Sequence, residues 1–144
     1  MRIFLPLDPG DHAVLTASRT RLELAADRPA WAVTAEARAE RPGVDEEDLD
    51  YDALQDAVHV ALQAAAPAER ALVIAADVPD RDLAAATDTG GAYGVRTTAD
   101  TTARIAALHV TELDAAAAEA DDTDPALLWF DVSEGAAALA YRRA

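Results

Sequence analysis

Residues 71–76 read Ala-Leu-Val-Ile-Ala-Ala, an unbroken apolar run between Arg70 and Asp77. Successive residues of a strand point to opposite faces of its sheet. A run that is apolar at every position is therefore typical of a central strand covered on both faces. This stretch predicts a sheet whose middle is buried.

Weaker strand and helix patterns lie on both sides of this run. Short β-prone segments occur at 2–7, 31–33, 93–97, 105–110 and 127–132. Helical spacing of apolar residues occurs at 12–24, 35–38, 113–120 and 134–143. The clearest helix follows the acidic run 45–48, whose carboxylates complement the positive end of the helix dipole, and ends at Pro67.

Three of the strands end in the same pattern of a β-branched residue, a hydroxyl residue and a nearby glutamate. The junctions are 33–36, 110–113 and 132–135. The hydroxyl can accept the free N–H groups of a starting helix, and the glutamate lies near its positive end. Repeated strand–cap–helix units favour α/β organisation. We therefore expect a mixed, mainly parallel sheet of five or six strands with helices packed on its faces.

The chain length fits one domain, because 144 residues are enough for a single ordinary core. We expect one α/β domain over residues 1–144. Between 81 and 103 the composition turns to Thr, Asp, Ala and Gly. This stretch predicts a long surface connection around one edge strand, of the kind that is often mobile or functional.

Charge and composition exclude several classes of function. Twelve arginines stand against 27 acidic residues, a net charge of −15. Nucleic-acid binding depends on basic residues that neutralise phosphates, so neither nucleic acid nor an anionic membrane surface is an expected partner. The absence of cysteine excludes a disulfide framework and a thiol nucleophile. The apolar runs are far shorter than the ~20 residues of a membrane span, and we expect a soluble, cytoplasmic protein.

A candidate catalytic pair comes from comparing the last two junctions. His109 stands two residues before Thr111, and Asp131 stands two residues before Ser133. If the two strands are parallel neighbours, His109 and Asp131 lie at the same level on one face. A paired aspartate would orient the imidazole and raise its pKa, as general acid–base chemistry requires. The alternative is a structural His–Asp hydrogen bond at the end of the sheet.

Two groups of carboxylates are candidate metal ligands. Asp77 and Asp80 flank a Val-Pro pair at a strand end and could bind magnesium, although turns favour aspartate for their own geometry. Asp52, Asp56 and His59 share one helix face at spacings of four and three and could hold a divalent cation. Ordinary helical ion pairing on a solvated face explains the second group equally well.

No cofactor is predicted, because no Gly-x-Gly-x-x-Gly motif follows a strand and no Walker-type Gly-Lys-Ser is present. Trp31, Trp129 and Phe130 lie in apolar strands and are predicted to anchor the core.

Several longer motifs cover most of the chain outside 81–103. They are Met1-Arg2-Ile3-Phe4-Leu5-Pro6, Ala32-Val33-Thr34, Asp45-Glu46-Glu47 leading to Tyr51, Ala75-Ala76-Asp77-Val78-Pro79-Asp80, Leu108-His109-Val110 and Leu127-Leu128-Trp129-Phe130-Asp131-Val132-Ser133. Their order resembles a small family of uncharacterised actinobacterial proteins, a domain of unknown function. This resemblance implies no activity, cofactor or catalytic residue.

The leading functional hypothesis is a small binding or regulatory module that acts through a protein partner or as a homodimer. It rests on the missing catalytic set and the missing cofactor motif. The alternative is a small acid–base or divalent-metal-dependent enzyme that uses His109 with Asp131.

Overall fold

Strand β4 (Arg70–Asp77) lies inside the sheet, between β1 (Arg2–Pro6) and β7 (Thr101–Asp114). In the computed structural model, which describes residues 1–144, all six residues from 71 to 76 are buried. Alternate members belong to the two different hydrophobic clusters on the two faces of the sheet. The predicted central strand covered on both faces is confirmed.

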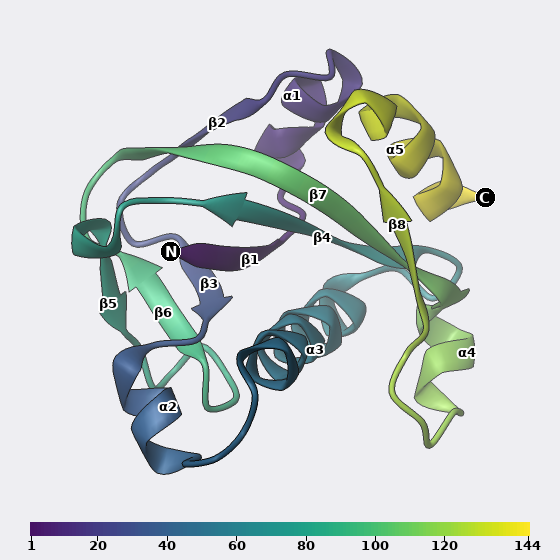
Figure 1. The fold of residues 1–144 in the computed structure, drawn as a ribbon. Coiled ribbons are helices and arrows are strands. Elements are labelled where there is room, and N and C mark those ends of the chain that lie inside the picture. Colours follow the sequence, from purple (N-terminus) through teal and green to yellow (C-terminus); the bar gives the residue numbers. More distant parts are fainter.

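Eight strands form one curled sheet, and every pairing in it is antiparallel (Figure 1). The remaining strands are β2 (Arg21–Leu24), β3 (Pro29–Ala32), β5 (Leu83–Ala85), β6 (Gly94–Thr97) and β8 (Leu127–Phe130). Their order across the sheet is β2-β7-β4-β1-β3-β6-β5, and β8 pairs with β7. The strong curl gives the sheet the shape of a half-barrel.

The prediction of a mixed, mainly parallel sheet of five or six strands is wrong, and the junction at Thr111 shows why. Thr111 lies inside β7, which continues to Asp114. Helix α4 (Ala115–Glu119) has five residues and rises only about 7 Å, whereas a strand of 14 residues extends about 46 Å. A parallel crossover must travel back along the strand. The chain instead turns and runs antiparallel to β7 as β8.

The other four helices are α1 (His12–Thr16), α2 (Ala35–Glu40), α3 (Glu46–Ala64) and α5 (Gly135–Arg143). The long helix after the acidic run is confirmed as α3, and the closing helix as α5. The predicted helix 12–24 is wrong in its second half, because Leu22 and Leu24 alternate with exposed residues and are buried in β2. None of the helices combines the length and the apolar character needed to cross a membrane.

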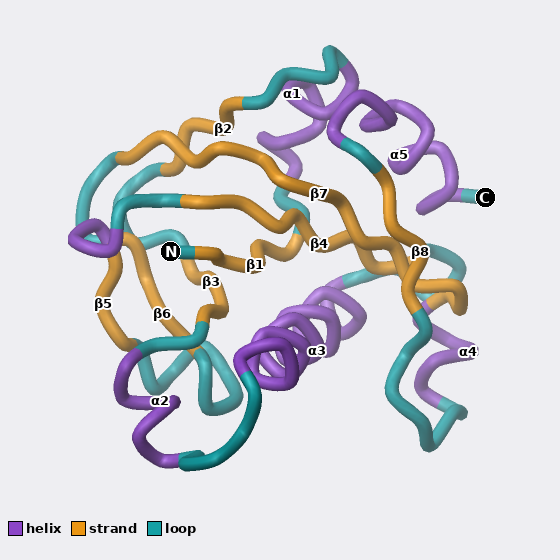
Figure 2. Tube along the Cα trace, in the orientation of Figure 1, coloured by secondary structure: helices purple, strands orange, loops and turns teal.

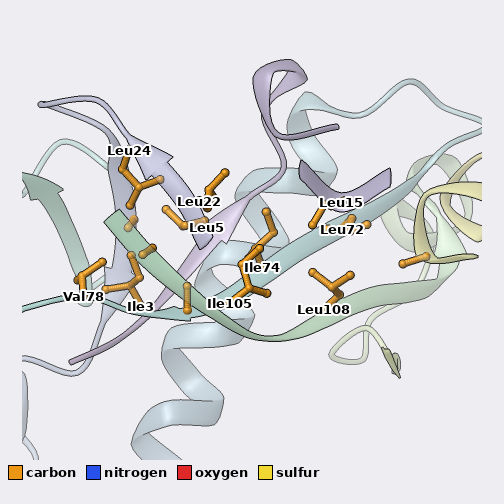
Figure 3. Close-up of a cluster of buried hydrophobic side chains, with 14 of the residues drawn as sticks. Ile3, Leu5, Leu15, Leu22, Leu24, Leu72, Ile74, Val78, Ile105 and Leu108 are labelled. Atoms are coloured by element: carbon orange, nitrogen blue, oxygen red, sulfur yellow. The ribbon is translucent and has the colours of Figure 1, made fainter. Parts of the chain in front are cut away.

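Two hydrophobic clusters lie on opposite faces of the sheet. Helix α3 runs along one face (Figure 2). Its Leu54 and Val58 pack with Trp31 and Val73 of the sheet. The concave face closes on itself, so that side chains from β1, β2, β4 and β7 meet there (Figure 3). Helices α1 and α5 contribute Leu15 and Leu139 to this second cluster. The curl of the sheet, together with α1 and α5, therefore covers the face that a full second layer of helices would cover in an α/β sheet.

The segment 81–103, expected as a long surface connection, contains the β5–β6 hairpin and the start of β7. The loop between β5 and β6 is tied to the body of the protein at Gly90, whose carbonyl accepts a hydrogen bond of 2.6 Å from Trp31 Nε1.

Candidate functional site

Strand β8 has one open edge. One edge of β7 pairs with β4, and its other edge is shared by β2, opposite 101–104, and β8, opposite 108–111. No further strand pairs with β8. Its outer edge therefore presents backbone groups that no other strand satisfies.

The register of the β7–β8 ladder identifies these backbone groups. The Glu112 N–H donates to the Ala126 carbonyl at 2.9 Å, so Ala126 faces β7. Hydrogen-bonded and non-hydrogen-bonded pairs alternate along an antiparallel ladder. Leu128 and Phe130 thus also bond to β7, whereas Leu127 and Trp129 direct their N–H and C=O groups outward.

The side chains of β8 are large and apolar, and two of them are exposed. Trp129 has 61% of its surface exposed and Leu128 has 37%. Leu127 packs against the cluster beneath α3. Phe130 packs against the cluster on the concave face and meets Tyr141 of α5 edge-on, with the ring centroids 6.0 Å apart. The strand is thus anchored by two residues while Trp129 stays in solvent, contrary to its prediction as a core anchor.

Helix α3 helps to position the chain just before β8. The Gln55 side chain is buried, and its Nε2 donates to the Pro125 carbonyl at 3.3 Å and to the Tyr51 hydroxyl at 3.2 Å. The spacing of apolar residues along this helix predicts that Tyr51 faces the core and that Gln55 lies on the opposite, polar face. In the structure Tyr51 is exposed, so the buried face of α3 is rotated toward the chain that enters β8.

His109 and Asp131 lie on or next to neighbouring strands, but the antiparallel register does not pair them. The residue opposite His109 is Trp129. The Asp131 carboxylate caps the turn at 132–134, where it accepts hydrogen bonds from the N–H and the hydroxyl of Ser133 at 3.1 and 2.5 Å. These bonds lower the pKa of Asp131.

The environment of His109 favours its neutral form. Burial lowers the pKa of His109, and the nearby positive charge of Arg2 lowers it further. A carboxylate partner would act in the opposite direction. His109 is thus a partly buried ring with a lowered pKa, opposite Trp129.

Asp77 and Asp80, the candidate magnesium ligands, each contact a cation of the protein itself. The Asp77 carboxylate accepts hydrogen bonds from Arg2 Nε and Nη2 at 2.8 and 3.3 Å, which lower the pKa of Asp77. Asp80 lies 3.0 Å from the N-terminal ammonium group of Met1. Nowhere in the chain do three or more His, Asp or Glu side chains gather in a group that could hold a metal ion.

Asp52, Asp56 and His59 all lie on α3, but each of them has different neighbours. Asp52 accepts a hydrogen bond from the Tyr93 hydroxyl at 3.5 Å. Asp56 packs against the loop before β6, where a Cβ atom added to Gly91 would come within 2.0 Å of its carboxylate. Burial raises the pKa of Asp56. His59 instead lines a shallow groove of about 480 Å³ between α3 and α4.

Sequence reasoning missed the open edge of β8 and its exposed tryptophan. The run 127–130 contains four large apolar residues, a composition that predicts burial whether or not a neighbouring strand exists. Acidic residues stand on both sides of this run, but Glu69 and Asp80 flank the central strand β4 in the same way. No signal in the sequence therefore distinguished the open edge.

Comparison with known proteins gives a family and nothing beyond it. The model of a family of unknown function (DUF6912) matches residues 1–139. No curated protein and no solved structure matches the chain. A hypothesis for its activity must therefore come from its own geometry.

Proposed function

Because the chain belongs to a family of unknown function (DUF6912), for which no activity is assigned, we propose a function from the geometry of β8. The protein is a binding module that acts through a protein partner, and the partner adds an extended strand to the open edge of β8. The observation that carries this proposal is the exposure of Trp129 on a strand with an unpaired edge.

The backbone of β8 supports binding by strand addition. The outward N–H and C=O groups of Leu127 and Trp129 can pair with an incoming strand, which is how added strands gain much of their affinity. Soluble proteins usually block such edges with charges, prolines or bulges. Strand β8 contains neither a charged residue nor a proline, so nothing within it blocks the approach of another strand.

Trp129 supports a specific contact with a partner rather than nonspecific adhesion to the protein surface. Tryptophan is enriched among the residues that dominate binding energy at protein interfaces. Covering the exposed 61% of its surface contributes about 4 kcal/mol, before the costs of association are subtracted. Because Leu127 and Phe130 hold the strand in place, little ordering is needed when a partner binds.

The geometry gives less support to acid–base catalysis by His109 and Asp131. Asp131 is engaged by Ser133, and the pKa of His109 is lowered rather than raised. Catalysis would also need a concave site that holds a substrate. His109 does not line the groove between α3 and α4 or the other principal hollows of the surface.

Affinity purification with matched variants tests the proposal. Trp129→Asp places a charge on the open edge, whereas Val44→Asp changes a residue that is also exposed, at 42%, in the loop before α3. Proteins retained by wild type and Val44→Asp but lost with Trp129→Asp are the expected partners. Each is then purified and titrated against the protein. Equal retention by all three forms would contradict a role for β8.

Quenching by acrylamide supplies the direct readout of that titration. The protein has two tryptophans, and Trp31 is only 1% exposed. Acrylamide in solution therefore quenches mainly Trp129. A partner that covers β8 should protect this emission, and a partner that leaves the emission accessible binds elsewhere.

A further inference from the structure

Acidic residues flank both ends of β8. Asp121, Asp122 and Asp124 precede it, and Asp131 and Glu134 follow it. Their carboxylates form no ion pair with any arginine of the protein. The three that precede the strand are exposed in the loop after α4. The open edge is thus an apolar strip of four residues between two negative ends.

This charge pattern disfavours a second copy of the chain as the occupant of the edge. In an antiparallel pair, the start of one β8 would lie beside the end of the other. In a parallel pair, the two starts would lie together. Acidic residues meet acidic residues in both cases, and like charges brought together across an interface are unfavourable. The net charge of −15 on each copy adds a long-range repulsion.

The same pattern fits one kind of partner in either strand direction. Both ends of β8 are negative, so an added strand finds complementary charge if basic residues flank it on both sides. Asp124 and Asp131 are seven residues apart in the chain. Matching basic residues would stand about seven positions apart, because paired strands have nearly the same rise per residue. The central residues would be apolar at the positions that contact Trp129 or Leu128.

We propose that the open edge of β8 binds an extended apolar segment with Lys or Arg at both ends, carried by a basic partner protein. This inference rests on the proposed function and adds the chemistry of the partner. Complementary charge aligns the segment and speeds its association, while Trp129 and the backbone of β8 hold it in place.

A library of random nine-residue peptides displayed on phage tests this proposal. Selection on the wild-type protein is followed by counter-selection on Trp129→Ala. The library removes the need to know the natural partner, and the counter-selection removes peptides that bind elsewhere on the acidic surface. The folding of Trp129→Ala is checked by circular dichroism. The expected peptides carry Lys or Arg near both ends and alternating apolar residues between them.

Synthetic copies of a selected peptide give the quantitative control. Replacing the basic ends by Glu should weaken binding at least tenfold, and 0.5 M salt should weaken the basic peptide far more than the Glu peptide. A proline in the middle keeps the charge but removes a backbone donor, and it should abolish the protection of Trp129 from acrylamide. Equal binding by the proline peptide would show charge attraction without strand addition and would overturn the proposal.

A second set of variants assigns the charge to the flanks of β8. The triple change Asp121→Asn, Asp122→Asn and Asp124→Asn should remove the preference for a basic residue at one end of the peptide only. Glu36→Gln, Glu40→Gln and Glu47→Gln, which remove the same charge from α2 and the start of α3, should leave the preference unchanged.

The outcomes separate the two proposals. Selected peptides that need Trp129 but lack basic ends would overturn the partner chemistry and leave strand addition standing. Failure to enrich any peptide on wild type over Trp129→Ala would overturn both. Light scattering of the free protein completes the test, because a dimer that disappears in Trp129→Ala would make a second copy the occupant.

Discussion

His109 on β7 and Trp129 on β8 lie directly opposite each other, on the face of the sheet that α3 partly covers. The antiparallel register puts the tryptophan where a parallel neighbour would have put Asp131. An imidazole with a lowered pKa and an exposed indole therefore occupy the position expected for an acid–base pair. The geometry therefore supports binding at the open edge of β8 better than it supports acid–base catalysis by His109 and Asp131.

The two tryptophans should differ sharply in their effect on stability. Trp31→Ala removes a buried ring and the hydrogen bond to Gly90, and we expect a loss of about 3–5 kcal/mol in the free energy of unfolding. Trp129→Ala removes a mostly exposed ring and should cost less than about 1 kcal/mol. Urea denaturation measures both. A large loss for Trp129→Ala would mean that the ring serves the fold.

His109 should make the stability of the protein depend on pH. Its pKa in the folded state is lowered, chiefly by burial, so below about pH 6.5 the unfolded chain takes up this proton more readily than the folded one. Stability due to His109 is then present at neutral pH and is lost as the pH falls from the unfolded pKa toward the folded pKa. His109→Gln should lose less stability than wild type between pH 7.5 and 5.5. Identical losses in urea denaturation would contradict the lowered pKa.

The contribution of Asp56 to stability should depend on pH in the opposite direction to that of His109. Burial raises the pKa of its carboxyl group in the folded state, so its contribution to stability is fully present below the unfolded pKa and is lost as the pH rises through the folded pKa. Asp56→Asn should raise the melting temperature by roughly 1–3 °C at pH 7 and leave it unchanged near pH 3. The amide oxygen can still accept the N–H of Ala92. A lower melting temperature at pH 7 would show that the charged form is the stabilising one.

Asp11 and Arg28 form the ion pair with the greatest effect expected on folding. Their atoms lie 2.8 Å apart, and only 3% of Asp11 and 16% of Arg28 side-chain surface is exposed. Arg28→Ala leaves a buried carboxylate without its cation and should cost about 3 kcal/mol or more. Arg2→Ala removes the partner of Asp77, where both side chains are more than 40% exposed, and should cost about 1 kcal/mol or less. Equal costs in chemical denaturation would mean that burial does not distinguish the two pairs.

Local patterns predicted the elements of this fold better than their arrangement. The run 71–76 predicted β4, and the acidic run 45–48 together with Pro67 predicted α3, because both signals depend on neighbouring residues. The predicted helix beyond Thr16 was wrong because Leu22 and Leu24 also fit the alternation of a strand. The secondary structure of such short segments depends on the element with which they pair.

Strand direction could not be predicted, because it depends on where each connection ends in space. The hydroxyl–glutamate pattern caps a helix at Thr34, but at Thr111 the hydroxyl lies within a strand and donates to the carbonyl of Leu113. The same local pattern thus occurs at the start of a helix and in the interior of a strand. The candidate pair His109 and Asp131 depended on parallel strands, and the exposure of Trp129 depended on the absence of a neighbour for β8. Neither the direction of β8 nor the absence of a strand beside it can be determined from the residues of β7 and β8 alone.

The open edge of β8 is tested most directly by hydrogen exchange of individual backbone amides, followed by nuclear magnetic resonance. The amides of Leu128 and Phe130 face β7 and should exchange slowly, whereas those of Leu127 and Trp129 should exchange fast in the free protein. A peptide that binds by strand addition should slow Leu127 and Trp129 and leave their neighbours unchanged. Slow exchange of Leu127 and Trp129 in the free monomer, or fast exchange that persists in the complex, would contradict a partner strand at this edge.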